Sequence, residues 1–436
     1  MLILLAGASG FIGSRIAQAI EDAGHTLVCG VRDPDAYQRQ HPQRRCVALD
    51  FAADDPLAGC RTTLERADAV VNAVGIAAEH GRNTFHALHA RGPIALFEAC
   101  ADARVKRVLQ LSALGADAQA STTFHLSKRT ADEALLALPV QGFVLQPSLV
   151  FGIDGASTQQ LLQLAAAPLA VPLPQGAGAI QPVHVDDVVA TVMRLLLHDE
   201  VAADAPRRLA IVGPEPLPLR GYLAALRAGM GLRPARFLPL PRGLMDRLAA
   251  AGDHLPGSVL NRQTWQMLQR GNVADAHDVT RLLGRAPRAA TGFVGPLRQA
   301  ALPVARLPLA LAMLRLSLAL VWLVTAVVSY GLYPVADSLA LLARTGITGP
   351  LAVLMLYGAA TFDLALGLAT LLHPRRWLWW AQLGLMGFYT VVITLKLPDY
   401  WLHPYGPVLK NLPIAAALCV LLAFEKPRQR RRGAPG

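Results

Sequence analysis

Cysteine is scarce in this sequence, and its pattern excludes two structural uses. The 436 residues include five cysteines, an odd number with no Cys-x-x-Cys pair, and most lie in apolar segments. A disulfide framework or a structural zinc site needs paired cysteines. We therefore predict reduced thiols and no metal site. The N-terminus also lacks basic residues before its first apolar run, which glycines end after Ala6, so we expect no secretory signal and a cytoplasmic N-terminal domain.

Charged residues are few, at 16%, whereas 53% of the residues are hydrophobic and the mean hydropathy is +0.37. These values predict a membrane-embedded part. From Arg306 onward the chain has 12 Lys and Arg but 4 Asp and Glu, a net charge of +8, which leaves +3 for residues 1–305. A nucleic-acid-binding domain would carry its basic residues on the folded part itself. We therefore expect a lipid bilayer with an anionic inner leaflet as the partner, and no nucleic acid.

The first 23 residues are predicted to form a strand, a glycine-rich turn and a helix. The apolar run Leu2–Ala6 leads into a G-x-x-G-x-x-G turn, and residues 14–23 follow as the helix. Glycines at such a turn allow backbone N–H groups to approach a pyrophosphate at the helix N-terminus. A tight turn without a ligand is the alternative, but the strand before it and the helix after it favour a dinucleotide. The candidate contacts are Gly7, Ser9, Gly10, Phe11, Ile12 and Gly13.

The second predicted strand, Thr26–Val31, ends at Arg32, where an NAD-binding fold usually has an acidic residue for the ribose 2′-hydroxyl. A guanidinium at this place suits a 2′-phosphate, and Arg15 in the first helix is a candidate second clamp. We therefore predict NADP(H) in preference to NAD(H). The neighbouring Asp33 keeps NAD(H) open as the alternative, in which Arg32 is a solvated surface residue.

Four more strands are predicted at 46–49, 69–74, 107–111 and 143–146, with helices between them. Six strands alternating with helices predict an α/β fold with a doubly wound parallel sheet. Ligands of such sheets bind at the carboxyl ends of the strands. The candidate cofactor contacts at these ends are Asp50, Asn72, Ala73, Gly75 and Pro147.

Seven short motifs together resemble the extended or atypical short-chain dehydrogenase/reductases (SDRs) over about residues 1–300. They are GASGFIG, Asp50, NAVG at 72–75, LSALGA from Leu111, Lys128, QPSLVFG at 146–152 and QPVHVDDVV from Gln181. Within that family they look most like the dehydrogenase-like accessory subunit of respiratory complex I. The resemblance implies an NAD(P)-binding Rossmann domain at 1–150 and a smaller, epimerase-like substrate lobe at 151–305. In the lobe we expect helices at 186–198 and 219–229 and a strand at 208–212.

The same resemblance implies an active site of a serine, a tyrosine and a lysine four residues after the tyrosine. The tyrosine relays a proton, the lysine lowers its pKa and holds the nicotinamide ribose, and the serine orients the substrate. Ser112 and Lys128 match this pattern, but Phe124 occupies the tyrosine position. A phenyl ring cannot donate a proton, so we expect poor reduction of simple carbonyls. The nearest titratable substitute is His125, which projects about 100° away from Phe124 on a helix.

Four apolar segments follow residue 305, at about 316–333, 350–372, 377–395 and 407–424. Roughly 20 apolar residues span a bilayer core, so the first three qualify, whereas Lys410 and Pro413 weaken the fourth. Tryptophans and tyrosines near the segment ends fit an interfacial belt. With YWLHPYGP at 400–407 and KNLP at 410–413, residues 312–425 resemble the DoxX-like membrane family, whose relatives are linked to respiratory and thiol redox processes. We predict a four-helix transmembrane domain at 306–426 and a basic tail at 427–436.

Three further features of the sequence concern the membrane: Asp363, the segment 236–257 and the distribution of basic residues. The first two each allow two interpretations. Asp363 lies mid-segment, where a charge is costly, and either pairs with Lys396, His403 or Lys410 or is protonated and structural. Residues 236–257 form either an amphipathic surface on the bilayer or an ordinary packed helix. Basic residues in the loop at 374–376 and in the tail predict an inner-membrane, multi-pass protein whose Rossmann domain and C-terminus are cytoplasmic.

Two functions of different class remain open from the sequence. In the first, the chain is an oxidoreductase that uses NADPH on a membrane-associated acceptor such as a quinone or a lipid-like carbonyl. In the second, it holds the nucleotide as a structural or redox-sensing ligand in a membrane assembly, such as one in the respiratory chain. Phe124 favours the second function, and the complete cofactor cradle is compatible with both.

Overall fold

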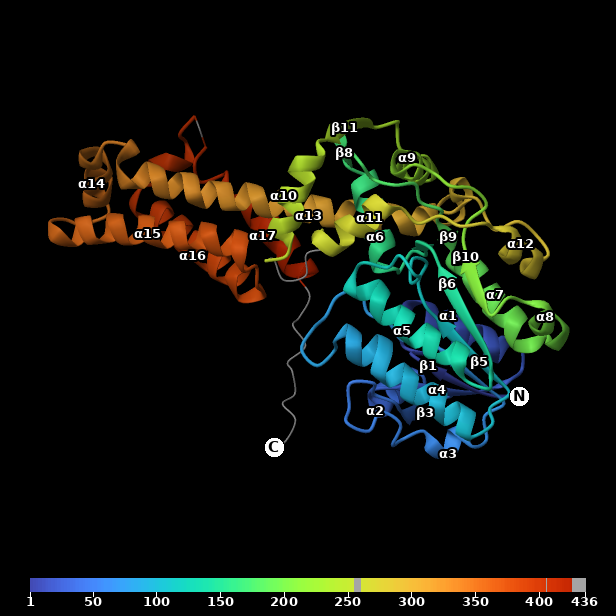
Figure 1. Ribbon diagram of the computed structural model, residues 1–436. Coiled ribbons are helices and arrows are strands. Elements are labelled where there is room, and N and C mark those ends of the chain that lie inside the picture. The colour runs from blue at the N-terminus through green and yellow to red at the C-terminus, as the bar shows by residue number, and fades with distance from the viewer. Residues whose placement is uncertain (255–259, 405, 426–436) are drawn as a thin grey trace. The chain divides into compact units, whose positions relative to one another are not determined.

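The computed structural model describes residues 1–254, 260–404 and 406–425, and the chain divides into two units, Met1–Ala305 and Arg306–Gly436 (Figure 1). The division falls within the long helix α13 (Arg298–Val327). The predicted basic tail at 427–436 and Tyr405 of the DoxX-like motif lie outside the described residues.

The first unit contains a seven-stranded parallel sheet in the order β10-β6-β5-β4-β1-β2-β3. Short apolar runs form its strands because both faces of the sheet are buried. The strands are β1 (Leu2–Ala6), β2 (Thr26–Val31), β3 (Arg45–Ala48), β4 (Ala69–Asn72), β5 (Arg107–Leu111), β6 (Gln141–Pro147) and β10 (Arg208–Ile211). The predicted doubly wound sheet is confirmed, with one correction. The strand that we assigned to the substrate lobe pairs with β6 and becomes the seventh strand of the main sheet.

Helices cover both faces of this sheet (Figure 1). On one face, α1 (Phe11–Asp22), α7 (Val185–Leu197) and α12 (His277–Leu283) enclose a core that includes Ile16 and Val192. On the other face, α4 (Gly92–Asp102) and α5 (Thr123–Ala137) enclose Phe97 and Leu135. The helix that connects β4 and β5 begins with a π-helical turn, His86–Arg91. Pro93 has no N–H for an α-helical bond to residue 89, which favours this wider turn.

The smaller lobe is built from two-stranded pairs and helices that follow the main sheet in sequence. Its strands are β7 (Val150–Phe151) with β9 (Val183–His184) and β8 (Ala170–Pro174) with β11 (Arg236–Leu240). Its helices include α6 (Ala156–Ala165), α9 (Leu219–Gly229), α10 (Arg242–Gly252) and α11 (Arg262–Arg270).

The segment considered as one amphipathic helix at 236–257 is instead the strand β11 followed by α10, and its last residues lie outside the described chain. Pro239 and Pro241 prevent a continuous helix. Met245 and Ala249 of α10 pack against Trp265 of α11, so α10 is a packed helix.

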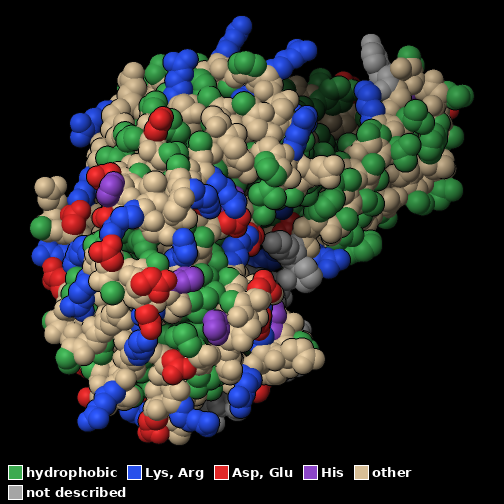
Figure 2. Space-filling model, turned by 90° about the vertical axis from the view of Figure 1, so that its right-hand side faces the viewer, with side chains coloured by type: hydrophobic (Ala, Val, Ile, Leu, Met, Phe, Trp, Pro, Cys, Tyr) green, Lys and Arg blue, Asp and Glu red, His purple; other side chains and the backbone are tan. Residues whose placement is uncertain are grey.

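The second unit is helical and consists of α13, a π-helical turn (Val328–Leu332), α14 (Val335–Arg344), α15 (Pro350–Leu372), α16 (Arg376–Lys396) and α17 (Asn411–Phe424). Among the described residues three helices are long and apolar enough to cross a membrane. The fourth predicted span is not confirmed, because the 14 residues of α17 extend about 21 Å, less than the roughly 30 Å of a bilayer core. Hydrophobic side chains dominate the visible surface of this unit (Figure 2).

Asp363 is buried on α15, close to a core that contains Trp322, Trp379 and Leu418. Within the described part of the chain it forms no ion pair with Lys396 or Lys410, and its Oδ1 has no hydrogen-bond partner. Lys396 and Lys410, two of the three predicted partners of Asp363, are therefore not confirmed. The helix α14 was not expected from the sequence.

Candidate functional site

The turn between β1 and α1 has room for backbone groups only. Gly7 has a φ of +82°, and a Cβ at this residue would lie 2.9 Å from the backbone of Ala73. A Cβ at Gly13 would lie 2.1 Å from the carbonyl oxygen of Gly7. Gly10 caps α1 without a side chain, and the first turn of α1 holds no acidic residue. The N–H groups at this helix start are therefore available to an anion, and the turn fits the pyrophosphate of a dinucleotide.

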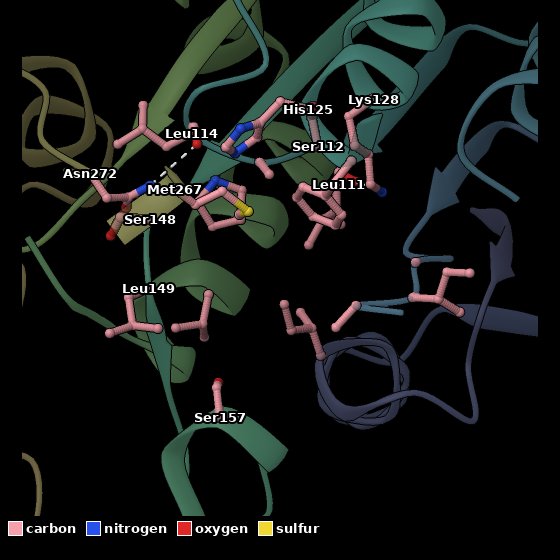
Figure 3. Close-up of a pocket in the computed structure, with 18 of the residues that line it drawn as sticks. Leu111, Ser112, Leu114, His125, Lys128, Ser148, Leu149, Ser157, Met267 and Asn272 are labelled. Carbon is pink, nitrogen blue, oxygen red and sulfur yellow. Dashed lines mark hydrogen bonds between the residues drawn. The ribbon is translucent and has the colours of Figure 1, made fainter. Parts of the chain in front are cut away.

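A cavity of about 560 Å³ lies where the strand order of the sheet reverses, with β1 between β2 and β4 (Figure 3). This is the place where doubly wound sheets bind ligands. Its walls come from the start of α1, the segments after β4, β5 and β6, and the helices α5, α6 and α11. Asn272 donates a hydrogen bond to the carbonyl of Leu114 at 3.2 Å, which joins the smaller lobe to the segment after β5.

Lys128 on α5 reaches the floor of this cavity from the helix and is buried. Its Nζ donates hydrogen bonds to the carbonyl oxygens of Val74 and Leu111, each at 3.1 Å. Burial lowers the pKa of Lys128 to about 8, and the nearby Asp132 opposes this shift. The ammonium group thus bridges the ends of β4 and β5 and has a third N–H for a ligand.

Ser112, at the end of β5, borders the same cavity and hydrogen-bonds a buried carboxyl group behind it. Its Oγ lies 2.5 Å from Oδ2 of Asp132, which is fully buried on α5. Gln146 Nε2 also donates to this oxygen, at 3.3 Å. Burial raises the pKa of Asp132 to about 6, while the Ser112 hydrogen bond and the charge of Lys128 oppose the shift.

Phe124 lines the cavity at the position where the family pattern has tyrosine, and its ring packs among aromatic neighbours. It meets the ring edges of Phe85 and His89 with centroids 5.7 and 5.4 Å apart. His125 also borders the cavity, and its Nδ1 lies 3.1 Å from Oγ of Thr122, the N-cap of α5. Burial and the charge of Arg270 lower the pKa of His125, which therefore favours the neutral ring.

Comparison with known proteins identifies both units. Residues 3–209 match the NAD dependent epimerase/dehydratase family, and residues 319–419 match the DoxX-like family. The chain joins an epimerase-type domain to a DoxX-like domain. The epimerase-type domain is a nicotinamide dinucleotide-binding domain, and the DoxX-like domain with its three apolar helices makes the chain a membrane protein.

Two curated relatives match the epimerase-type part. A ceramide reductase of Caulobacter vibrioides is 24% identical over 197 residues, which are 44% of this chain and 60% of that protein. The mitochondrial 40 kDa subunit of NADH-ubiquinone oxidoreductase of Neurospora crassa is 23% identical over 204 residues, 45% of this chain and 52% of that subunit. The chain thus spans about half to three fifths of the length of these relatives.

Solved structures of sugar-nucleotide epimerases share the fold. A nucleoside-diphosphate-sugar epimerase of Staphylococcus aureus superposes with a TM-score of 0.53 at 16% identity, covering 68% of this chain and all of that one. UDP-glucuronic acid 4-epimerase of Bacillus cereus, in complex with UDP-glucuronic acid and NAD, gives 0.51 at 15% identity, covering 69% and 99%. Similarity at this level of identity shows the fold alone.

The epimerase-type cavity brings together most of the residues that the sequence pointed to. Those lining it are Gly10, Phe11, Ile12, Ala73, Gly75, Ser112, Phe124, His125, Lys128 and Pro147. Gly7 and Ser9 belong to the adjoining turn, and Gly13 belongs to the first turn of α1. Asn72 does not face the cavity, because it is fully buried, donates to Gln110 at 2.7 Å and accepts from the N–H of Val74 at 3.1 Å. It shapes the turn that carries Ala73 and Gly75.

The residues expected near the adenosine end lie apart from the cavity. Asp50 pairs with Arg82 at 3.1 Å and accepts from the N–H of Ala52. Arg15, the candidate second phosphate clamp, forms an ion pair with the carboxylate of Asp154. Arg32 is exposed and lies 3.4 Å from the side-chain oxygen of Asn83. Asp33 caps α2 (Pro34–Gln40) by accepting from the N–H of Ala36 at 2.8 Å.

Two residues of the site escaped the sequence reasoning. Asp132 follows Lys128 by four residues, a spacing that places both on one face of a helix and could have drawn attention to it. His89 is fully buried, accepts from the N–H of Ile76 at 3.0 Å and lies 3.1 Å from Oγ of Ser127. Burial and the charge of Lys128 lower its pKa to about 2, so it is neutral. No local pattern marks His89, because its partners come from other elements.

Proposed function

We propose that this chain is a membrane-anchored, NAD(P)H-dependent oxidoreductase that acts on an apolar membrane-associated acceptor, a quinone or a lipid-like carbonyl. The observation that carries the proposal is the lining of the cavity. Among the described residues that border the cavity, only Lys128 has a Lys, Arg, Asp or Glu side chain. A nucleotide sugar would need cationic groups for its diphosphate, whereas aliphatic and aromatic walls suit an apolar ligand.

The apolar walls come from both parts of the epimerase-type unit. Phe11, Ile12 and Leu114 belong to the part that contains the main sheet, and Met267 and Leu268 of α11 belong to the smaller lobe. Ser112 and Lys128 stand at one end of this lining (Figure 3). An acceptor with a polar head and an apolar body could place the head beside these two residues and the body between the walls.

Cofactor binding would use the glycine turn and Lys128. The turn N–H groups would hold the pyrophosphate, and the free N–H of Lys128 would bind the nicotinamide ribose. A reduced nicotinamide, when bound, supplies the hydride. The protein must therefore orient the acceptor, which falls to Ser112, and manage the proton that a reduced oxygen requires.

Exposed Arg32 supports NADPH as the preferred cofactor within this proposal. In the described part of the chain the Arg32 guanidinium forms one hydrogen bond, to Asn83, which is long at 3.4 Å, so little is lost when Arg32 turns to a 2′-phosphate. Asp33, the residue that could instead favour NADH, has its carboxylate engaged at the start of α2. The acidic alternative at this position is thereby weakened.

The ceramide reductase relative supports a lipid-like acceptor. The apolar helices of the DoxX-like domain would keep the enzyme at the bilayer in which such an acceptor dissolves. We place the protein in an inner membrane with the nucleotide-binding domain in the cytoplasm, where nicotinamide cofactors are supplied. The Lys and Arg bias of the loop at 374–376 supports this orientation.

A second function is favoured by Phe124. Without the family tyrosine, the domain could hold NADPH as a structural or redox-sensing ligand of a membrane assembly, and the relative in NADH-ubiquinone oxidoreductase supports such a role. The two functions differ in one property, because a structural nucleotide would not be oxidised by any acceptor.

A substrate panel tests the proposal. Purified full-length protein in lipid nanodiscs should oxidise NADPH with a short-chain quinone or a long-chain ketone and show no activity with a UDP-sugar. Met267→Arg, which puts a charge on the apolar wall, should lower the rate with the apolar acceptors at least tenfold, whereas Gln266→Arg, on the exposed side of the same helix, should not. Equal rates with a UDP-sugar would contradict the proposal.

A further inference from the structure

Ser112 connects the cavity to a carboxyl group that the cavity does not reach. Its Oγ borders the cavity and lies 2.5 Å from Oδ2 of Asp132, which is fully buried and absent from the lining. The hydrogen bond therefore joins the place where an acceptor oxygen would lie to a titratable group inside the protein.

Asp132 is buried, and among the described residues it forms no ion pair. Gln146 donates to Oδ2 at 3.3 Å, and Oδ1 has no hydrogen-bond partner in the described chain. The charged groups that face it are Lys128 on its own helix and Arg208 on β10. Lys128 bonds to carbonyl oxygens, and the guanidinium of Arg208 donates to the carbonyl of Ala116 at 3.2 Å. A carboxyl group so placed gains from being protonated, because a buried charge without a partner is costly.

We propose that Asp132 stores the proton that the missing tyrosine would have supplied and passes it through Ser112 to the acceptor oxygen. This deepens the proposed function and rests on it. Asp132 acts through Ser112 and is thus a positioning residue, whereas Ser112 touches the acceptor.

The hydrogen-bond donors and acceptors of Ser112 and Asp132 allow this relay only when Asp132 is protonated. When Asp132 is ionised, it only accepts, and the Ser112 hydroxyl hydrogen points to the carboxylate. When Asp132 is protonated, it donates to Oγ, and the hydroxyl hydrogen is free to point into the cavity. As the carbonyl carbon gains a hydride, its oxygen takes the hydroxyl proton, and Oγ takes the proton of Asp132. The alcohol forms, Asp132 is left as carboxylate, and a proton from solvent in the cavity returns to it through Ser112.

The buried surroundings of Asp132 favour its protonated form at a higher pH than is usual for a carboxyl group. Burial raises the pKa of Asp132 to about 6, so its protonated fraction falls tenfold for each pH unit above that value. His125 is the competing donor at the cavity, and burial and the charge of Arg270 lower the pKa of its ring, which disfavours its charged form. The proposal thus predicts carbonyl reduction that declines above about pH 6.

Infrared spectroscopy of the full-length protein in nanodiscs tests the store without any substrate. We expect a protonated-carboxyl band that titrates with a midpoint near pH 6 and is missing in Asp132→Asn. Gln146→Leu removes a donor that stabilises the carboxylate, so it should move the midpoint to higher pH. Glu133→Gln is the matched control, since this neighbouring side chain is exposed and pairs with Arg129, and it should leave the band unchanged. Absence of a band that depends on Asp132 between pH 5 and 8 overturns the proposal.

Turnover then tests the relay. With a long-chain ketone, Asp132→Asn should lower kcat at pH 6 at least a hundredfold, remove the decline above pH 6 and leave the Kd for NADPH unchanged, since a positioned acid contributes about 10²- to 10⁴-fold. An Asp132→Asn protein that keeps the wild-type rate and pH profile overturns the relay. If the wild-type protein shows the band but none of the acceptors supports NADPH oxidation, the proposed function is contradicted. The protonated state of Asp132 is then still upheld.

Discussion

Replacing Arg32 with alanine should remove the preference for NADPH over NADH that we propose. Arg32 follows β2 at the place that faces the adenosine ribose in this fold. Its guanidinium is exposed, and its hydrogen bond to Asn83 is 3.4 Å long. The carboxylate of Asp33 already accepts from the N–H of Ala36 at 2.8 Å. At the position that distinguishes the two nucleotides, the Arg32 guanidinium is thus only weakly held, whereas the Asp33 carboxylate already has a close hydrogen-bond donor.

The size of the preference follows from one charge-assisted contact. A hydrogen bond to a charged group contributes about 1.5 to 3 kcal/mol, or roughly 10- to 150-fold in Kd. Arg32 is exposed, and solvent weakens such a pair, so the lower end of this range applies. We expect NADPH to bind about tenfold more tightly than NADH in the wild type and equally well in Arg32→Ala.

Calorimetric titration of both nucleotides at one fixed ionic strength measures this effect. Arg82→Ala is a suitable control, since Arg82 is also exposed and pairs with Asp50 at 3.1 Å. The control should keep the wild-type ratio of the two Kd values. Equal affinities in the wild type, or a ratio that survives in Arg32→Ala, would refute the reasoning.

Three further predictions concern chemistry, the cofactor turn and topology. Phe124→Tyr should raise the reduction of simple ketones at least tenfold at pH 8, where Asp132 is ionised; unchanged rates would show that the hydroxyl is not what the site lacks. Gly13→Ala should abolish NADPH binding because its Cβ would lie 2.1 Å from a turn carbonyl oxygen, whereas Gly243→Ala, with no atom within 4 Å, should bind normally. A reporter fusion after His373 should report cytoplasm, because α13 and α15 lie between it and the cytoplasmic domain; an external signal there would contradict this orientation, and a fusion at the C-terminus reports whether α17 crosses.

The main sheet could be predicted largely because its signals are local. The strands Thr26–Val31 and Arg107–Leu111 and the helix Leu219–Gly229 have the predicted bounds. Continuous apolar runs mark buried parallel strands, and a 3.6-residue period marks the helix. The glycine turn was predictable for the same reason, since its three glycines lie within seven residues.

Contacts between distant segments could not be predicted in this way. Asp132 meets Ser112 across 20 residues, and Arg15 is held by Asp154 across 139, so both pairings depend on the finished fold. The seventh strand was assigned to the wrong lobe because a strand pattern does not reveal its pairing partner. The fourth span is not confirmed because its predicted apolar run began at residue 407, whereas the helix begins at Asn411 and has 14 residues.

Acceptor-dependent oxidation of NADPH by the purified full-length protein in lipid nanodiscs tests the central claim most directly. The account predicts oxidation with a quinone or a long-chain ketone, and no oxidation above background in Lys128→Met, which loses the ammonium group that bridges Val74 and Leu111. A wild-type protein that binds NADPH tightly but oxidises it with neither acceptor would contradict the account and support a structural nucleotide.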